Sequence, residues 1–256
     1  MIEVLKSFIG EDRIWIYGFG VEGRSTFAFL KAWGYPVSVL DQGLSQEVDG
    51  VTQFVGKDTF LDILPTLGPQ DLVFRSAGIS PSKPELQLLI NNGARVSSQL
   101  ELFHMLVDTP VIAVTGTLGK GTTCSFMKHM FESQGVKVEI GGNFGLAMLD
   151  LVHQAKNLDW IILELSSFQL MDFKGNFEIS ILLRTTSEHL DWHLSQEEYL
   201  WAKSNLVRNQ QEHQHLIYYS DSENCQTMIQ SSLAKRLPFG ESVSQTGTPS
   251  AQRIIF

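Results

Sequence analysis

Cysteines and long apolar runs are scarce in this chain of 256 residues. The two cysteines, Cys124 and Cys225, are too few and too far apart for a disulfide framework or a zinc site with paired cysteines. No apolar run approaches the roughly 20 residues that a membrane helix needs. Glu3 and Lys6 interrupt the segment where a secretory signal would have its apolar core. These absences predict a cytoplasmic protein without membrane insertion.

Positive charge is scarce as well. The chain has 19 Lys and Arg residues against 28 Asp and Glu residues, and its formal net charge is -9. Because such a surface repels phosphate backbones, we expect no nucleic-acid partner, although a local basic site for a small anion stays compatible with it. The 43% of hydrophobic residues exclude a disordered chain. At roughly 150 residues per domain, the length predicts two domains.

Segments typical of strands and of helices alternate along the chain. Strands are predicted at 13–17, 36–40, 71–74, 110–115, 136–140, 160–164, 179–183 and 215–219, and helices at 24–33, 85–91, 124–134 and 195–209. This alternation predicts the α/β class with parallel sheets. Since the pattern restarts near residue 107, we expect a Rossmann-like domain at 1–107 and a P-loop-type mononucleotide-binding α/β domain at 108–256.

A first glycine motif, Gly18-x-Gly20-x-x-Gly23, joins a predicted strand to a predicted helix, and Asp41 ends the next strand. Glycines let the backbone approach a phosphate, and a helix N-terminus offers free N–H groups and the positive end of its dipole. Asp41 would then bind a ribose hydroxyl. The alternative is a tight structural turn, and Glu22 would place a negative charge beside the expected phosphates.

A second glycine motif spans Thr115–Thr123. Its backbone N–H groups can cradle a polyphosphate, Lys120 can reach the β- and γ-phosphates, and a hydroxyl can bind Mg²⁺. The strict P-loop spacing is absent, because Val114 takes the place of the first glycine and Gly121 follows the lysine. A structural turn is the alternative, but such a turn has little need of a lysine.

A third group of polar residues follows the strands predicted later in the chain, and comprises Asn143, Glu164, His189, Asp191, His193 and Lys203. Ligands of open parallel sheets bind at the carboxyl ends of the strands. Glu164 closes an apolar strand and suits a hard cation such as Mg²⁺. Taken singly, each of these residues could be an ordinary surface residue. Their expected convergence on the Lys120 loop favours a site for Glu164 and His189.

Taken in order, the motifs resemble the Mur ligases, ATP-dependent amide-forming enzymes of peptidoglycan precursor synthesis. The resemblance extends over about residues 12–240 and rests on Gly116-Thr-x-Gly-Lys120, Gly142-Asn-x-Gly145, Glu164-Leu-Ser-Ser-Phe-Gln169, His189-Leu-Asp191 and Ala202-Lys203. The first glycine loop and the run from Glu164 are most similar to the branch that joins D-glutamate to UDP-N-acetylmuramoyl-L-alanine (UDP-MurNAc-L-alanine). Ser76-Ala-Gly-Ile79 resembles that branch's Ser-Pro-Gly-Ile segment.

The resemblance implies a role for each motif. The residues expected to bind the uridine diphosphate (UDP) sugar are Gly18, Gly20, Val21, Gly23, Asp41, Ser76, Gly78, Asn143, Ser166 and Gln169. Those expected to bind ATP are Gly116, Thr117, Gly119, Lys120, Gly121, Thr122 and Asn143. One or two Mg²⁺ ions would be held by Glu164, His189 and Lys203, with carbamylation of Lys203 as a possible modification. The expected catalytic residues are Lys120, His189 and Lys203.

The reaction implied by the resemblance has two steps: ATP phosphorylates a carboxylate of the substrate, and an amine then displaces phosphate from the acyl phosphate. The sequence departs from the family pattern at Glu22, Leu118 and Gly121, and the usual Asn-x-Thr-x-Asp-His becomes Arg184-x-Thr-x-Glu-His189. Family members also have a third domain, which binds the amino acid. We expect that domain to be absent, the ATP-binding domain to be incomplete, and a protein partner to be needed if the third domain acts in trans.

Two other functions are compatible with parts of the sequence. A catalytically inactive relative of the ligases, binding a uridine nucleotide sugar or ATP, would explain Leu118, Gly121 and the expected absence of the third domain. An NAD(P)-dependent oxidoreductase would explain the first glycine motif alone, and it leaves Lys120 and Glu164 without a role.

Overall fold

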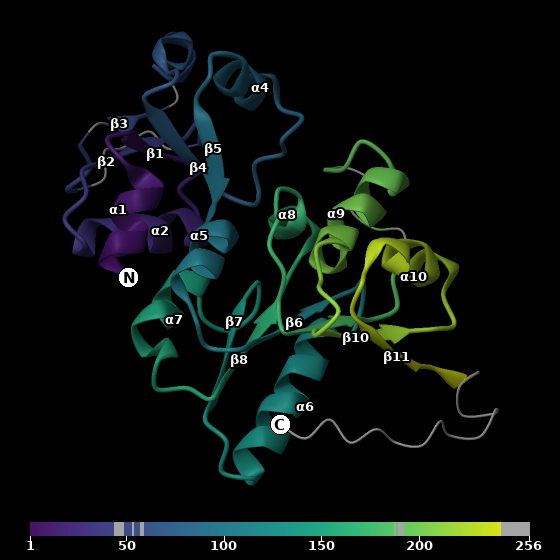
Figure 1. Cartoon of the computed structure of the whole chain (residues 1–256). Coiled ribbons are helices and arrows are strands. Elements are labelled where there is room, and N and C mark those ends of the chain that lie inside the picture. Colours follow the sequence, from purple (N-terminus) through teal and green to yellow (C-terminus); the bar gives the residue numbers. More distant parts are fainter. Residues whose placement is uncertain (44–48, 53, 57–58, 187, 189–191, 242–256) are drawn as a thin grey trace.

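The computed structural model describes residues 1–43, 49–52, 54–56, 59–186, 188 and 192–241 (Figure 1). It contains a five-stranded sheet in the order β3-β2-β1-β4-β5 and a six-stranded sheet in the order β11-β10-β9-β6-β8-β7. All strand pairings in this part of the chain are parallel. The predicted α/β class with parallel sheets is therefore confirmed.

The first sheet is built from residues before position 99. Its strands are β1 (Arg13–Tyr17), β2 (Val37–Leu40), β3 (Phe54–Val55), β4 (Asp71–Arg75) and β5 (Arg95–Ser98). The helices are α1 (Ile2–Ile9), α2 (Val21–Ala32), α3 (Phe60–Ile63) and α4 (Pro84–Asn91), and a 3₁₀ turn, η1, spans Leu64–Thr66. Because β1 lies between β2 and β4, the chain order reverses there, and the loops after β1 and β4 border the crevice where open parallel sheets bind ligands.

The second sheet follows α5 (Gln99–Leu106). Its strands are β6 (Val111–Thr115), β7 (Val138–Gly142), β8 (Trp160–Glu164), β9 (Ile179–Leu182), β10 (His215–Tyr219) and β11 (Lys235–Phe239). The helices are α6 (Lys120–Ser133), α7 (Met148–Ala155), α8 (Ser167–Leu170), α9 (Gln196–Arg208) and α10 (Glu223–Met228), with a 3₁₀ turn, η2, at Ile229–Ser231. Strand β6 occupies the interior of this sheet, between β8 and β9.

Alternating side chains of β6 divide the hydrophobic core between the two faces of the second sheet. Ile112 and Val114 pack with Cys124 of α6. Val111 and Ala113 belong to a larger core that also includes α1, α2, α5 and α7. Figure 1 shows α2, α5 and α7 between the two sheets, and α6 on the other face of the second sheet. The larger core therefore connects the two sheets.

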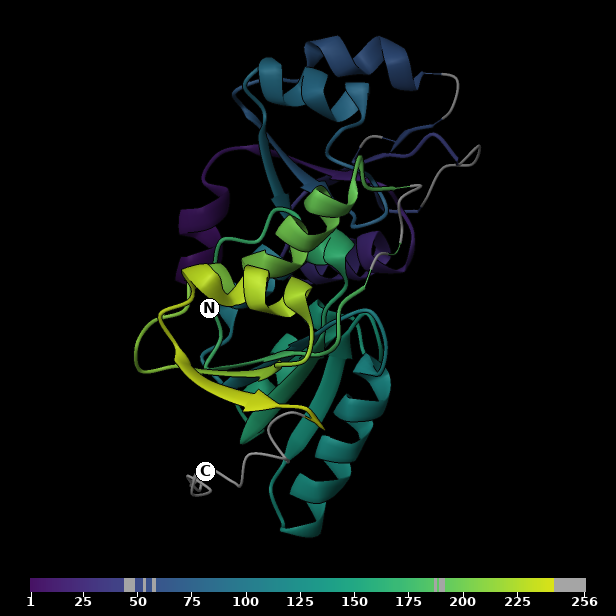
Figure 2. The same cartoon turned by 90° about the vertical axis from the view of Figure 1, so that its right-hand side faces the viewer.

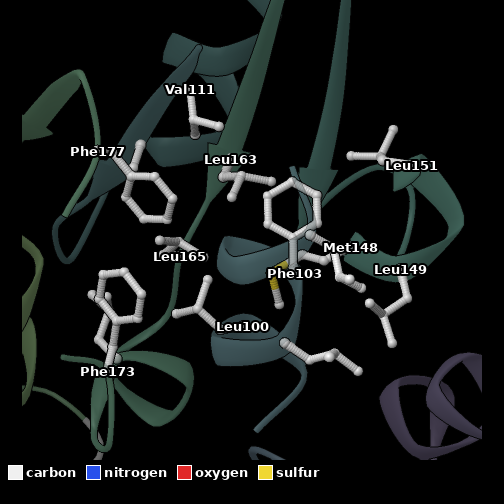
Figure 3. Packing of buried hydrophobic residues seen from close by; sticks show 14 of the residues in the cluster. Leu100, Phe103, Val111, Met148, Leu149, Leu151, Leu163, Leu165, Phe173 and Phe177 are labelled. Atoms are coloured by element: carbon white, nitrogen blue, oxygen red, sulfur yellow. The ribbon is translucent and has the colours of Figure 1, made fainter. Parts of the chain in front are cut away.

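Figure 3 shows the centre of this connecting core. Phe103 of α5 and Met148 of α7 lie beside Leu163 of β8, and all three side chains are at most 1% exposed. Each of these buried apolar side chains contributes about 1.5–3 kcal/mol relative to an exposed position. The view turned by 90° shows the first sheet with its helices, in purple and blue, above the second sheet (Figure 2). The core fixes how the loops of one sheet face those of the other.

The structure places several boundaries differently from the sequence analysis. Helix α2 begins at Val21 and α6 at Lys120, earlier than predicted, because each glycine loop leads into its helix without a break. Strand β7 extends to Gly142, since Gly142 lies so close to Glu164 that a Cβ atom would be 2.2 Å from the Glu164 carbonyl oxygen. The elements α1, β3, α3, β5, α5, α7, α8, α10 and β11 were not predicted. In the described part of the chain, no helix is long and apolar enough to cross a membrane.

Candidate functional site

The first candidate site lies at the carboxyl ends of β1, β2 and β4. The Phe19 N–H donates to Asp41 Oδ2 at 2.6 Å, and Ser76 Oγ donates to the Gly18 carbonyl at 2.6 Å. Gly18 adopts a φ of 90°, which favours glycine. These bonds bring three loops that are distant in sequence into one cradle around the first turn of α2. We call the loops at residues 18–23, 41–43 and 76–79 the first cradle.

Gly23 is required by this geometry, whereas Gly20 is not. A Cβ atom on Gly23 would lie 2.1 Å from the carbonyl oxygen of Gly18, and 3.1 Å from Ser76 Oγ. A Cβ atom on Gly20 would meet nothing within 4 Å, and Gly20 has a φ of -73° that any residue adopts. The two glycines of the motif therefore serve different purposes: close packing at Gly23, and open space for a ligand at Gly20.

We expect Gly23→Ala to reduce the free energy of unfolding by about 2–3 kcal/mol, because the backbone of the cradle must move to accept the methyl group. Gly20→Ala is the matched control and should change it by less than about 0.5 kcal/mol. Urea denaturation followed by circular dichroism measures both. Equal stabilities of the two variants would contradict the packing role assigned to Gly23.

Glu22 lies in the first turn of α2 and is partly buried. Its Oε2 accepts a hydrogen bond from the Ala77 N–H at 2.5 Å. Burial raises the pKa of Glu22, and this shift is opposed by the Ala77 N–H, the charge of Arg75 and the side chain of Gln169. The carboxylate thus points toward the loop after β4 and the second sheet.

The second candidate site is the loop between β6 and α6. Gly116 and Gly119 have φ values of 147° and 85°, conformations that L side chains rarely adopt. Lys120 Nζ donates to the carbonyls of Gly116 and Thr117 at 3.1 and 3.0 Å. The lysine therefore lies folded over the loop, within reach of an anion held by the first turn of α6.

Glu164 ends β8 beside this loop and is 5% exposed. Its Oε1 accepts a bond from Asn143 Nδ2 at 3.0 Å. A Cβ atom on Gly121 would lie 3.1 Å from its Oε2, so a side chain at position 121 would contact the carboxylate. The structure thus brings Lys120, Asn143, Glu164 and Gly121 together, as the sequence analysis expected for this part of the site.

Lys203 of α9 approaches the same loop from the opposite side. Its Nζ donates to the Gly116 carbonyl at 3.0 Å and lies 4.9 Å from the centre of the Tyr199 ring. Burial, and then the charge of Lys120, lower the pKa of Lys203 to about 7. The amine is therefore more readily neutral than that of a surface lysine.

Of five further residues named in the sequence analysis, three lie in the described part of the chain and two do not. Ser166 and Gln169 form a reciprocal cap at the start of α8, and Gln169 also interacts with Glu22 of the first cradle. Thr122 lies on the exposed side of the first turn of α6. His189 and Asp191 lie outside the described residues. The roles predicted for residues of this paragraph remain predictions.

Two residues at the site were missed by sequence reasoning. The Tyr199 hydroxyl lies 2.9 Å from Thr117 Oγ1, so it braces the lysine loop from α9. The only signal for it was its position one helical turn before Lys203. Arg75 is 1% exposed and bonds the Phe168 carbonyl of α8 and the Asp172 side chain in the turn after α8. No motif marked this arginine, since its partners are far away in sequence.

The side chains present suit Mg²⁺, which in nucleotide sites usually keeps several waters and binds one or two carboxylates plus substrate phosphates. Glu164 supplies such a carboxylate beside Lys120. Among the described residues, no group of three His, Cys, Asp or Glu side chains could hold a metal ion. Any Mg²⁺ ion would thus depend on the phosphates as well as on Glu164.

Comparison with known proteins gives consistent results. Residues 114–249 match the family described as the Mur ligase middle domain. A UDP-N-acetylmuramoylalanine--D-glutamate ligase from Ruminiclostridium cellulolyticum is 32% identical over 87% of this chain and 49% of that protein. The ligase of the same name from Clostridium botulinum (strain Langeland) is 29% identical over 91% of this chain and 52% of that protein. The chain thus spans about half the length of these curated relatives.

Solved structures show the same fold. The UDP-N-acetylmuramate:L-alanyl-gamma-D-glutamyl-meso-diaminopimelate ligase of Neisseria meningitides matches with a TM-score of 0.56 and 16% identity, over 90% of this chain and 78% of that one. A murein peptide ligase from Psychrobacter arcticus matches with a TM-score of 0.51 and 14% identity, over 89% of this chain and 53% of that one. These structures show the shared fold, and the family match, which extends over more than half of the chain, shows that the chain belongs to the Mur ligase family.

Proposed function

We propose that this chain binds a uridine nucleotide sugar and ATP as part of an ATP-dependent amide ligase that adds D-glutamate to UDP-MurNAc-L-alanine. The observation that carries the proposal is the meeting of Lys120, Asn143 and Glu164 at one edge of the second sheet, in a member of the Mur ligase family. Relatives that bear this ligase name, at 29–32% identity, support the choice of substrates.

On this proposal, residues 1–107 form the domain for the nucleotide sugar. The first turn of α2 would hold its diphosphate, since Gly20 leaves open space there. Asp41 would bind the ribose while it keeps the N–H groups of Phe19 and Gly43. Gly78, where a Cβ atom would meet nothing within 4 Å, leaves space at the other side of the cradle.

Residues 108–256 would bind ATP. Lys120 would leave the carbonyls of Gly116 and Thr117 and bind the β- and γ-phosphates, where its charge would offset charge that develops on the transferred phosphoryl group. Glu164 would hold Mg²⁺, which would screen the phosphates from the attacking carboxylate. Asn143 would fix the Glu164 carboxylate through its existing hydrogen bond.

Lys203 would complete this site after carbamylation, as the family resemblance implies. The modification converts a cation into an anionic metal-binding group. Burial of the amine supports it, because a neutral amine is the form that reacts with carbon dioxide. His189 would be a further ligand on the same grounds of resemblance.

A second function, binding without catalysis, is favoured by Gly121. Gly121, the residue after Lys120, carries no hydroxyl, although a Cβ atom at this position would lie 3.1 Å from Glu164 Oε2. Leu118 of the same loop is 75% exposed and offers no polar group to a nucleotide. Gly121 would weaken binding of the metal ion, and Leu118 would weaken binding of the phosphates.

Calorimetric titration with UDP-MurNAc-L-alanine and with ATP tests the proposal, followed by an assay for phosphate release that depends on D-glutamate. The assay uses the chain alone and together with a third domain taken from a relative. Binding of both ligands with phosphate release in either assay supports the ligase. Binding without release under both conditions favours the second function, and absence of binding overturns both.

A further inference from the structure

Two departures from the family pattern meet in the first cradle. The family resemblance implies Ser or Thr at the position of Glu22, and the Ser-Pro-Gly-Ile segment that it implies has proline at the position of Ala77. Ala77 has an N–H group that proline would lack, and this N–H donates to Glu22 Oε2 at 2.5 Å. The two departures therefore form one interaction, in which the carboxylate satisfies a donor that would otherwise face the cradle.

The first cradle thus already contains negative charge from the chain itself. Glu22 follows directly on the turn that would hold a diphosphate, and Asp41 accepts the N–H of Phe19 in the same turn. The positive charge of Arg75 acts on Glu22, and the same guanidinium also bonds Asp172 and the Ile79 carbonyl. Because Arg75 is shared among these partners, it only partly offsets the charge of Glu22.

A diphosphate placed on the first turn of α2 would lie close to this carboxylate. Partial burial reduces the screening of their repulsion by water, so the repulsion is larger than between surface charges. Uridine and sugar groups carry no such charge and would not experience this repulsion.

We propose that Glu22 is a specificity-determining residue that weakens the hold of the first cradle on phosphate, so that the cradle selects its ligand chiefly by the uridine and sugar groups. The inference rests on the proposed function, since it takes the first cradle as the uridine nucleotide site. It adds that a nucleoside diphosphate alone is a poor ligand of this chain.

The test compares uridine with UDP, for the wild type and for Glu22→Gln. A saturating non-hydrolysable ATP analogue occupies the lysine loop, so that UDP cannot bind there. Glutamine keeps an acceptor for the Ala77 N–H and removes only the charge. We expect Glu22→Gln to bind UDP about tenfold more tightly and uridine with unchanged affinity, as measured by calorimetry and by ligand-observed NMR.

Glu212→Gln is the charge-matched control, because Glu212 is exposed and lies in the turn before β10, on the second sheet. It should leave both affinities unchanged. If Glu22→Gln leaves UDP affinity unchanged or lowers it, or alters uridine affinity equally, the inference is overturned while the uridine site stands. If neither ligand binds to either protein, the assignment of the first cradle is overturned and the inference with it.

Discussion

Lys120→Met should lower the affinity for ATP by about a hundredfold and leave the affinity for UDP-MurNAc-L-alanine unchanged. A hydrogen bond to a charged group contributes about 1.5–3 kcal/mol, and 1.4 kcal/mol corresponds to a factor of ten. Lys120 would make such bonds to two phosphates. In the structure it already lies over the loop, bonded to two carbonyls that a phosphate would replace. Calorimetric titration of ATP measures the loss.

Lys128→Met is the matched control for this variant. Lys128 lies on the same helix, α6, where it pairs with Glu139 and Glu132, away from the lysine loop. Its loss should change ATP affinity by less than about twofold, because distant surface charges are screened by salt. Unchanged ATP binding by Lys120→Met would show that the loop does not hold the phosphates, and would remove the main support for a ligase.

Arg75→Leu should reduce the free energy of unfolding by about 3–5 kcal/mol, which is a large part of a typical protein's stability. The Arg75 side chain has no solvent exposure and pairs with Asp172, whose side chain is 31% exposed. Its Nη1 donates to the Ile79 carbonyl at 2.6 Å, and its Nη2 donates to the Phe168 carbonyl at 3.2 Å. Leucine would leave these partly buried acceptors without their donor and remove the buried positive charge beside Asp172. Urea denaturation measures the change.

Arg95→Leu is the control for the loss of an ion-paired arginine. The Arg95 side chain is 48% exposed and pairs with Asp12, so we expect a loss of at most about 1 kcal/mol. A loss of that size for Arg75→Leu as well would contradict its role as the buried connection between the sheets. Arg75→Lys should fall between the two results, because an ammonium keeps the charge but cannot donate to several partners in the fixed directions of a guanidinium.

The sequence predicted the parallel sheets and the lysine loop because both depend on local patterns. Strands β1 and β6 are short apolar segments followed by a glycine turn, and β8 is a short apolar segment that ends at Glu164, so the positions of these strands follow from neighbouring residues. The same holds for Lys120, which begins the helix after the glycine loop, and for Glu164, which ends β8; both positions are near the strand ends where ligands bind. The helix starts at Val21 and Lys120 were placed too late, since glycine is a poor helix former by itself.

Only the tertiary structure showed how these parts combine. The order β3-β2-β1-β4-β5 brings Gly18 and Ser76 side by side, although helices α2 and α3 and strands β2, β3 and β4 lie between them in the sequence. Arg75 became visible as a structural residue only through its bonds to Asp172 and Phe168, and Tyr199 only through Thr117. None of these contacts has a sequence signature, because the partners are brought together by packing.

By itself, the sequence determined the fold class and the two glycine loops, whereas the chemistry it assigns to the lysine site stays a prediction. The tertiary structure decided how the departures from the family pattern act. Glu22 and Ala77 are far apart in the sequence but share one hydrogen bond. The side chain that Gly121 lacks would lie directly against Glu164. The reason is physical: local patterns fix the elements, whereas the charge and space that a ligand meets depend on atoms that only folding brings within a few ångströms.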